Sequence, residues 1–224
     1  MSAPEPKTNG AARRARPAKP HGASKRARRR RLPPEERRAQ LLSIAIDVFA
    51  DRGLGAARHA EIAERAGVAV STVFVYFPTR EALVDAVLDE VADFFVRAAE
   101  RLHGQPKDCV AILRDVGEAF LEVLRTHRSH AIVWLEWGAA VREEVWPRYR
   151  AFTESVVAIT RDTLERGRAE GSIAADADLE SLARLFASSS QSIARLRIGD
   201  VDAETIERYQ EAVLRAIVRE EALD

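Results

Sequence analysis

The segment from His59 to Glu81, HAEIAERAGVAVSTVFVYFPTRE, combines residue types and spacings that suit contact with DNA. It predicts two short helices, near 57–66 and 70–76, joined by a turn at Gly67, because glycine adopts left-handed backbone angles at little cost. Four apolar residues recur at helical spacing and are expected to anchor the second helix: Val70, Val73, Phe74 and Phe77. Uncharged side chains are then left facing outward, a composition that suits the major groove of DNA.

Five side chains of this segment are candidate DNA contacts: His59, Ser71, Thr72, Tyr76 and Arg80. The hydroxyl groups and Arg80, at the start of the next helix, are well placed for phosphate, which positions a protein without reading sequence. Tyr76 has an alternative interpretation, packing between helices. For the segment as a whole, the alternative is an ordinary helical hairpin with no role in DNA binding.

The charge is segregated along a chain that is neutral overall, with 35 basic and 35 acidic residues. The first 38 residues hold 13 Lys and Arg against 3 Asp and Glu, and the remaining 186 hold 22 against 32. Because an acidic body repels DNA, the basic end is where a polyanion is expected to bind. Its four consecutive arginines suit a narrow minor groove, with a solvated tail as the alternative: Arg28, Arg29, Arg30 and Arg31.

The composition also bounds the organisation of the chain. The first 34 residues hold six of the nine prolines and no Phe, Trp or Tyr, so residues 1–33 are expected to form a disordered basic arm. Residues 34–80 are predicted to form a helix-turn-helix domain, and residues 81–224 a helical regulatory and dimerisation domain. The fold class is therefore all-α, with a three-helix DNA-binding module followed by a helical body.

Start and stop signals place the helices of this fold. The first is expected to open at Pro33-Pro34 and to end at Gly53, with a buried stripe that holds Leu41, Ala45, Val48 and Phe49. A long helix follows from a cap at Thr79, with Gly104 and Pro106 as its stop. Further helices are predicted near 107–126, 129–141, 144–170, 177–198 and 202–221, with caps at Asp176 or Asp178 and at Asp202.

Several functional classes are disfavoured by the sequence. The chain contains no GxGxxG, GxxxxGK[ST], GxSxG, HExxH or CxxC pattern, so we expect no enzyme activity and no cofactor. His127 and His130 alone make an incomplete metal site, and Cys109 is expected to be a core residue. No apolar run approaches the length needed to cross a bilayer, so a soluble, cytoplasmic protein is expected. A helical enzyme and an architectural DNA-coating protein remain as alternatives.

The order and spacing of these elements over about 50 residues, from Arg37 to Leu88, resemble the tetracycline-repressor (TetR) family. The segments KRARRRRLPPEER, STVFVYFPTRE and WLEWGAAVREEVWP are similar to the LuxR/HapR/SmcR group within that family, the master regulators of quorum sensing. The resemblance implies a dimeric transcription factor, with activation as well as repression among its roles. Members of that group carry Asn at the position of Val75, and residues 171–200 match them poorly.

The resemblance also implies a cavity for a small hydrophobic ligand in the body, lined by Phe95, Phe120, Trp134 and Trp137. The alternative for these aromatic residues is plain core packing.

Pairing of two subunits is expected because one hairpin contacts too few bases for a specific site, so such modules bind palindromic DNA as symmetric pairs. The last two helices offer apolar stripes for a homodimer interface, with core closure as the alternative. The candidate interface residues are Phe186, Ser190, Ile193, Tyr209, Val213 and Ile217.

Overall fold

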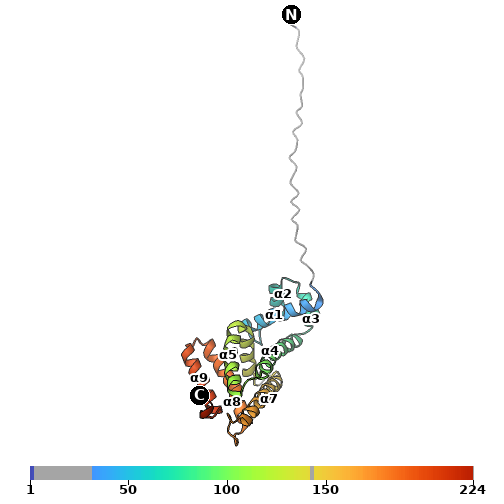
Figure 1. Ribbon diagram of the computed structural model, residues 1–224. Coiled ribbons are helices and arrows are strands. Elements are labelled where there is room, and N and C mark those ends of the chain that lie inside the picture. Colours follow the sequence, from blue (N-terminus) through green and yellow to red (C-terminus); the bar gives the residue numbers. More distant parts are fainter. Residues whose placement is uncertain (3–31, 142–143, 224) are drawn as a thin grey trace. The chain divides into compact units, whose positions relative to one another are not determined.

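The chain folds into helices, shown in Figure 1 for a computed structural model that describes residues 1–2, 32–141 and 144–223. From Pro34 onward these helices form one compact unit. The described α-helices are α1 (Pro34–Arg52), α2 (His59–Ala66), α3 (Val70–Tyr76), α4 (Arg80–His103), α5 (Cys109–Thr126), α6 (Arg128–Ala139), α7 (Trp146–Glu170), α8 (Leu179–Ile198) and α9 (Ala203–Ile217). A short 3-10 turn, η1 (Glu220–Ala222), follows α9. The expected all-α class is confirmed.

The first three helices form a small module at one end of the compact unit (Figure 1). The predicted stripe of α1 is buried, and Ile62 and Val73 from α2 and α3 complete the packing with no exposed surface. Gly67 ends α2 in the left-handed conformation, with φ 62° and ψ 41°, and its N–H donates to Glu64 O at 3.0 Å. The predicted turn is therefore confirmed, because this backbone angle favours glycine.

Side-chain caps fix where the longer helices begin. Thr79 accepts a hydrogen bond from the N–H of Ala82 at 3.1 Å, and Asp202 accepts one from Thr205 at 2.8 Å. Of the two candidates before α8, Asp178 is the cap, since it accepts from the N–H of Ser181 at 3.2 Å. Such caps satisfy backbone donors that the first turn of a helix leaves unpaired.

The helix boundaries differ from the sequence prediction by a few residues. The second helix begins at His59 rather than 57, and the last α-helix ends at Ile217 rather than 221. The chain beyond Ile217 leaves the helix because Val218 adopts an extended conformation, with φ −98° and ψ 146°.

Two hydrophobic clusters hold the helices together. The larger one joins the stripe of α1 to Leu88 of α4, Trp137 of α6 and Ile206 of α9, so the module and the body share buried side chains. The smaller one lies among α5, α7, α8 and α9 and includes Cys109, as expected, and Leu164. The domain boundary at residues 80 and 81 stays a prediction. Among the described residues, none of the helices has the length and apolar character to span a bilayer.

Candidate nucleic-acid interface and ligand cavity

Helix α3 presents an uncharged face to solvent. Val75 is 75% exposed, and Ser71, one turn earlier, is also exposed, whereas Val73 and Phe77 are buried. The prediction that Val70 and Phe74 anchor this helix is wrong, because they are 40% and 46% exposed. Thr72 and Tyr76 are partly buried, and Tyr76 packs against the main cluster, in line with the alternative interpretation.

His59 lies beneath this face, and its burial argues against its assignment as a DNA contact. It is only 7% exposed, and its Nε2 lies 2.8 Å from the carbonyl oxygen of Phe77. Its ring stacks on Phe74, with 4.2 Å between the ring centroids and 4° between the ring planes. His59 thereby attaches the start of α2 to the end of α3 through Phe74 and Phe77. His59 is a positioning residue, because it supports the surface that it was expected to form.

Arg80 is exposed, but its guanidinium is held by the module. It donates to the carbonyl oxygen of Leu54, in the loop between α1 and α2. The backbone N–H of Leu54 donates to Glu136 Oε1 of α6 at 3.1 Å. The peptide groups of Leu54 therefore connect the start of α4 to the body of the protein.

Gly53 makes this connection sterically possible. Its φ is 86°, a left-handed angle that favours glycine, and a Cβ atom built on it would lie 2.6 Å from Glu136 Oε1. The prediction that Gly53 ends the first helix is confirmed. The contact of Glu136 with the module was not predicted from the sequence. The available signal was an acidic residue between Trp134 and Trp137 in an otherwise apolar segment.

Two of the predicted contact groups stay predictions. Arg28, Arg29, Arg30 and Arg31 lie outside the described residues. Ser71, Thr72 and Tyr76 lie on α3, and their contacts with DNA stay predictions.

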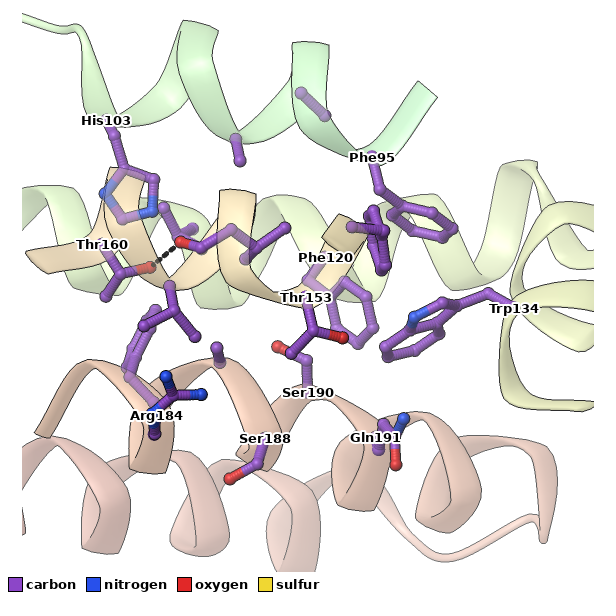
Figure 2. A pocket seen from close by; sticks show the side chains of 18 of the residues that line it. Phe95, His103, Phe120, Trp134, Thr153, Thr160, Arg184, Ser188, Ser190 and Gln191 are labelled. Carbon is purple, nitrogen blue, oxygen red and sulfur yellow. Dashed lines mark hydrogen bonds between the residues drawn. The ribbon is translucent and has the colours of Figure 1, made fainter. Parts of the chain in front are cut away.

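A cavity of about 550 Å³ lies among α4, α5, α6, α7 and α8. Figure 2 shows that Phe95, Phe120 and Trp134 gather at one end of it, as the family resemblance implied. The rings pack against one another, with the Trp134 centroid 5.3 Å from that of Phe95 and 5.7 Å from that of Phe120. This end offers an aromatic surface to an apolar molecule.

Trp137 does not line the cavity, which corrects its assignment as a pocket residue. It is fully buried and packs against Tyr149 and Phe152, at centroid distances of 5.4 and 5.8 Å. Its indole N–H donates to Val145 O at 3.0 Å, so the residue fixes the start of α7. Core packing, the alternative in the sequence prediction, describes Trp137. The cavity wall instead includes Trp146, Tyr149 and Phe152, which the pattern did not separate from the core.

The opposite end of the cavity holds His103, Thr160 and Arg184 (Figure 2). Burial lowers the pKa of His103 to about 4, with a smaller contribution from the nearby Arg166 guanidinium, so its ring is neutral at pH 7. Its Nδ1 lies 2.8 Å from Thr163 Oγ1. This polar end therefore offers hydrogen-bonding groups and no charge from histidine.

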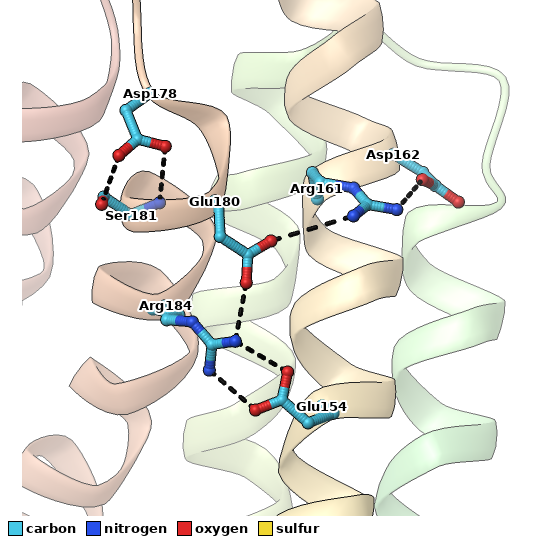
Figure 3. A network of polar contacts seen from close by, with 7 residues as sticks. All are labelled: Glu154, Arg161, Asp162, Asp178, Glu180, Ser181 and Arg184. Carbon is cyan, nitrogen blue, oxygen red and sulfur yellow. Dashed lines mark hydrogen bonds and ion pairs between the residues drawn. The ribbon is translucent and has the colours of Figure 1, made fainter.

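The charge of Arg184 is balanced by two carboxylates. Glu154 of α7 receives two hydrogen bonds from it, at 2.9 and 2.7 Å, and Glu180 lies 2.6 Å away (Figure 3). These partners raise the pKa of Arg184 above its usual value, with the hydrogen bonds to Glu154 as the largest cause. Glu180 also pairs with Arg161 at 3.8 Å, so the network joins α7 and α8 beside the cavity.

The predicted dimer interface is divided between the interior and the surface of the protomer. Ile193 and Ile217 are 5% exposed and belong to the protomer's own clusters, so their assignment to the interface is wrong. The other four residues are partly buried: Phe186, Ser190, Tyr209 and Val213. Phe186 and Ser190 line the cavity and also a second hollow of about 310 Å³ among α5, α8 and α9.

The two histidines and the cysteine have local roles. His127 and His130 pack against Phe94, with centroid distances of 4.8 and 4.7 Å. Within residues 32–141 and 144–223, no three His, Cys, Asp or Glu side chains gather as a metal site would require. Burial raises the pKa of the Cys109 thiol to about 11, so it stays protonated at neutral pH.

Comparison with known proteins agrees with this arrangement. The family described as bacterial regulatory proteins, tetR family, matches residues 41–87, which run from within α1 through α2 and α3 to the first part of α4. The HTH-type transcriptional regulator LuxR of Vibrio harveyi is 36% identical over 158 residues, covering 70% of this chain and 77% of that protein.

Solved structures share the fold. A TetR-family regulator from Agrobacterium tumefaciens has a TM-score of 0.72 at 18% identity, covering 83% of this chain and all of that one. FadR from Bacillus subtilis in complex with stearoyl-CoA has a TM-score of 0.67 at 21% identity, covering 81% and 97%. The family match and the similarity to LuxR show that the chain belongs to the tetR family of bacterial regulatory proteins and is a DNA-binding transcriptional regulator rather than an enzyme.

Proposed function

We propose that the protein acts in the bacterial cytoplasm as a homodimer that binds palindromic operators and responds to an uncharged, largely apolar small molecule. The observation that carries the operator proposal is the uncharged, exposed face of α3, held from below by His59. A seven-residue helix spans two turns and contacts few base pairs. Two copies related by a twofold axis read both halves of a palindrome and supply the missing contacts.

Helices α8 and α9 are the proposed pairing surface. Phe186, Tyr209 and Val213 keep part of their apolar surface exposed, and Ser190 is small enough for close approach. Leu185, on the outer side of α8, is 42% exposed. Because a symmetric interface uses the same patch on both subunits, a single stripe of this kind is sufficient for a homodimer.

The class of ligand follows from the groups that line the cavity. Among the described residues no Asp or Glu lines it, the charge of Arg184 is balanced by Glu154 and Glu180, and His103 is neutral. The remaining lining cation, Arg101, is exposed to solvent, so its charge is screened by water and stabilises a buried ion little. A charged group would therefore lose its hydration in the cavity with little compensation. An uncharged molecule with an apolar body therefore fits best, whereas the related structure of FadR holds stearoyl-CoA.

A role in quorum sensing, with both repression and activation, is part of the proposal. It rests on similarity to LuxR of Vibrio harveyi over 158 residues. In this proposal, the basic arm with its four consecutive arginines adds contacts in the minor groove beside each half-site.

Selection from a random DNA pool by the full-length chain tests the operator proposal. We expect enrichment of a palindromic site, and sedimentation equilibrium at micromolar concentration should show a dimer. Val213→Asp should give monomers with at least tenfold weaker binding to the selected duplex. A wild-type monomer bound to one half-site, or a pool without enrichment, would contradict the proposal.

The ligand class is tested with 1-dodecanol and dodecanoate, two probes of equal chain length that differ in charge. We expect the alcohol to raise the unfolding temperature more than the acid, and Ala98→Phe, which fills the cavity, to abolish this effect. Ala151→Phe, on the exposed side of α7, is the matched control and should keep it. A stronger effect of dodecanoate would exclude the uncharged class, and no effect of either probe would exclude the apolar one.

A further inference from the structure

Exposed apolar surface is concentrated on α3. In the described part of the chain six large hydrophobic side chains are exposed, and three of them belong to this helix of seven residues: Val70, Phe74 and Val75. Exposed apolar groups that cluster in this way mark a contact surface. On a helix that faces DNA, the group that covers them must be an apolar part of the major groove.

The major groove offers one apolar group, the C5-methyl of thymine, and otherwise presents donors and acceptors. Helix α3, with the sequence VSTVFVY, carries no Arg or Lys for the bidentate contact to guanine and no Asn or Gln for that to adenine. Its hydroxyl groups can pair with several bases and discriminate little. Apolar contact with methyl groups is therefore the specific readout that this helix can provide.

Val75 is the side chain best placed for this contact. Phe74 uses one face of its ring against His59, at 4.2 Å between centroids, and Val70 stands at the first position of the helix. Val75 is 75% exposed and has no comparable partner, and it lies one turn after the exposed Ser71. Both groups therefore lie on the outer side of α3.

We infer that Val75 packs against the C5-methyl group of a thymine in each operator half-site and makes that thymine a specificity determinant. This inference rests on the proposed binding of palindromic operators. Burial of one methyl group contributes about fourfold to affinity. Two half-sites acting independently give about 15-fold for the whole operator.

The test replaces thymine by deoxyuracil, which removes the methyl group and leaves the pairing edge intact. The probe is the duplex enriched from the random pool, with each thymine replaced in turn and binding measured by fluorescence anisotropy. Wild-type protein should lose about fourfold at one thymine of each half-site. Val75→Ala should bind the unmodified duplex more weakly and show no further loss with deoxyuracil at that position.

Ser71→Ala is the matched control, because it changes the neighbouring exposed side chain and keeps Val75. It should retain the full deoxyuracil effect, and thermal unfolding should show that both variants are folded. An equal deoxyuracil effect in wild type and Val75→Ala, or none at any thymine, would overturn the inference while leaving operator binding intact. A pool without an enriched duplex would instead overturn operator binding itself, and the inference with it.

Discussion

Gly53 and Gly171 form a natural pair for measuring what the contact of Glu136 with the DNA-binding module contributes. Both glycines have φ 86°, so alanine at either position meets the same left-handed strain. A Cβ atom at Gly171 would have no neighbour within 4 Å, whereas one at Gly53 would lie 2.6 Å from Glu136 Oε1. The two substitutions therefore differ by the Glu136 contact.

The magnitude follows from what the carboxylate must give up. Left-handed strain costs alanine about 1–2 kcal/mol at each site. At Gly53 the carboxylate must also move away, and it then loses the hydrogen bond from the Leu54 N–H, now 3.1 Å long. A partly exposed hydrogen bond to a charged group contributes about 1 kcal/mol. We expect Gly53→Ala to cost about 2–3 kcal/mol and Gly171→Ala about 1–2 kcal/mol.

Urea unfolding tests this expectation with four variants: Gly53→Ala, Gly171→Ala, Glu136→Ala and the double variant Gly53→Ala/Glu136→Ala. The free energies can be compared only if the slope of the unfolding transition is the same for all of them. In a Glu136→Ala background, Gly53→Ala should cost no more than Gly171→Ala, because only the backbone strain remains. The coupling between Gly53 and Glu136 in this double-mutant cycle should be about 1 kcal/mol. Equal costs for both glycine variants in the wild-type background would refute the reasoning.

Three further predictions concern buried polar groups. His59→Phe keeps the ring stacked on Phe74 but leaves the Phe77 carbonyl without its partner, so it should cost about 1–3 kcal/mol in urea unfolding. It should also weaken DNA binding measured by anisotropy, and unchanged DNA affinity would contradict the positioning role of His59. Trp137→Phe should destabilise more than Trp134→Phe in thermal unfolding, since the first side chain is fully buried and its indole N–H donates to Val145 O, whereas the second lines the cavity. Because the pKa of His103 falls on folding from 6.5 to about 4, the unfolded chain binds more protons between these values, and stability is lost as pH decreases through this window. The loss should be about 3 kcal/mol between pH 7 and pH 4 and smaller in His103→Gln, as urea midpoints at both pH values will show.

Local signals in the sequence predicted the parts of the fold that depend on near neighbours. Gly53 and Gly67 both adopt the expected left-handed angles, and Thr79 and Asp202 both cap helices, because these roles are set within four or five residues. The aromatic end of the cavity was also predicted, through the family resemblance. For Phe95 and Phe120 the structure agrees, since both line the cavity.

Contacts between distant segments were not predictable from the same signals. His59 lies 18 residues from its hydrogen-bond partner Phe77, and Glu136 lies 82 residues from Leu54. A single polar residue on a helix does not show whether it faces solvent or a partner elsewhere in the fold. For the same reason, periodicity placed Ile193 and Ile217 on apolar stripes but did not divide those stripes between the core and an interface.

Helix α6 shows how the cavity and the DNA-binding module are joined. Trp134 and Glu136 are two residues apart, and because successive residues of an α-helix turn by about 100°, they point to nearly opposite sides. Trp134 lines the cavity, while Glu136 accepts the hydrogen bond from Leu54, whose carbonyl oxygen accepts from Arg80. Two discrete positions of α6 would therefore move the loop between α1 and α2 and the start of α4 together. A ligand shifts such an equilibrium only through contacts that differ between the two positions, and on α6 the side chain able to supply them is Trp134 rather than the fully buried Trp137.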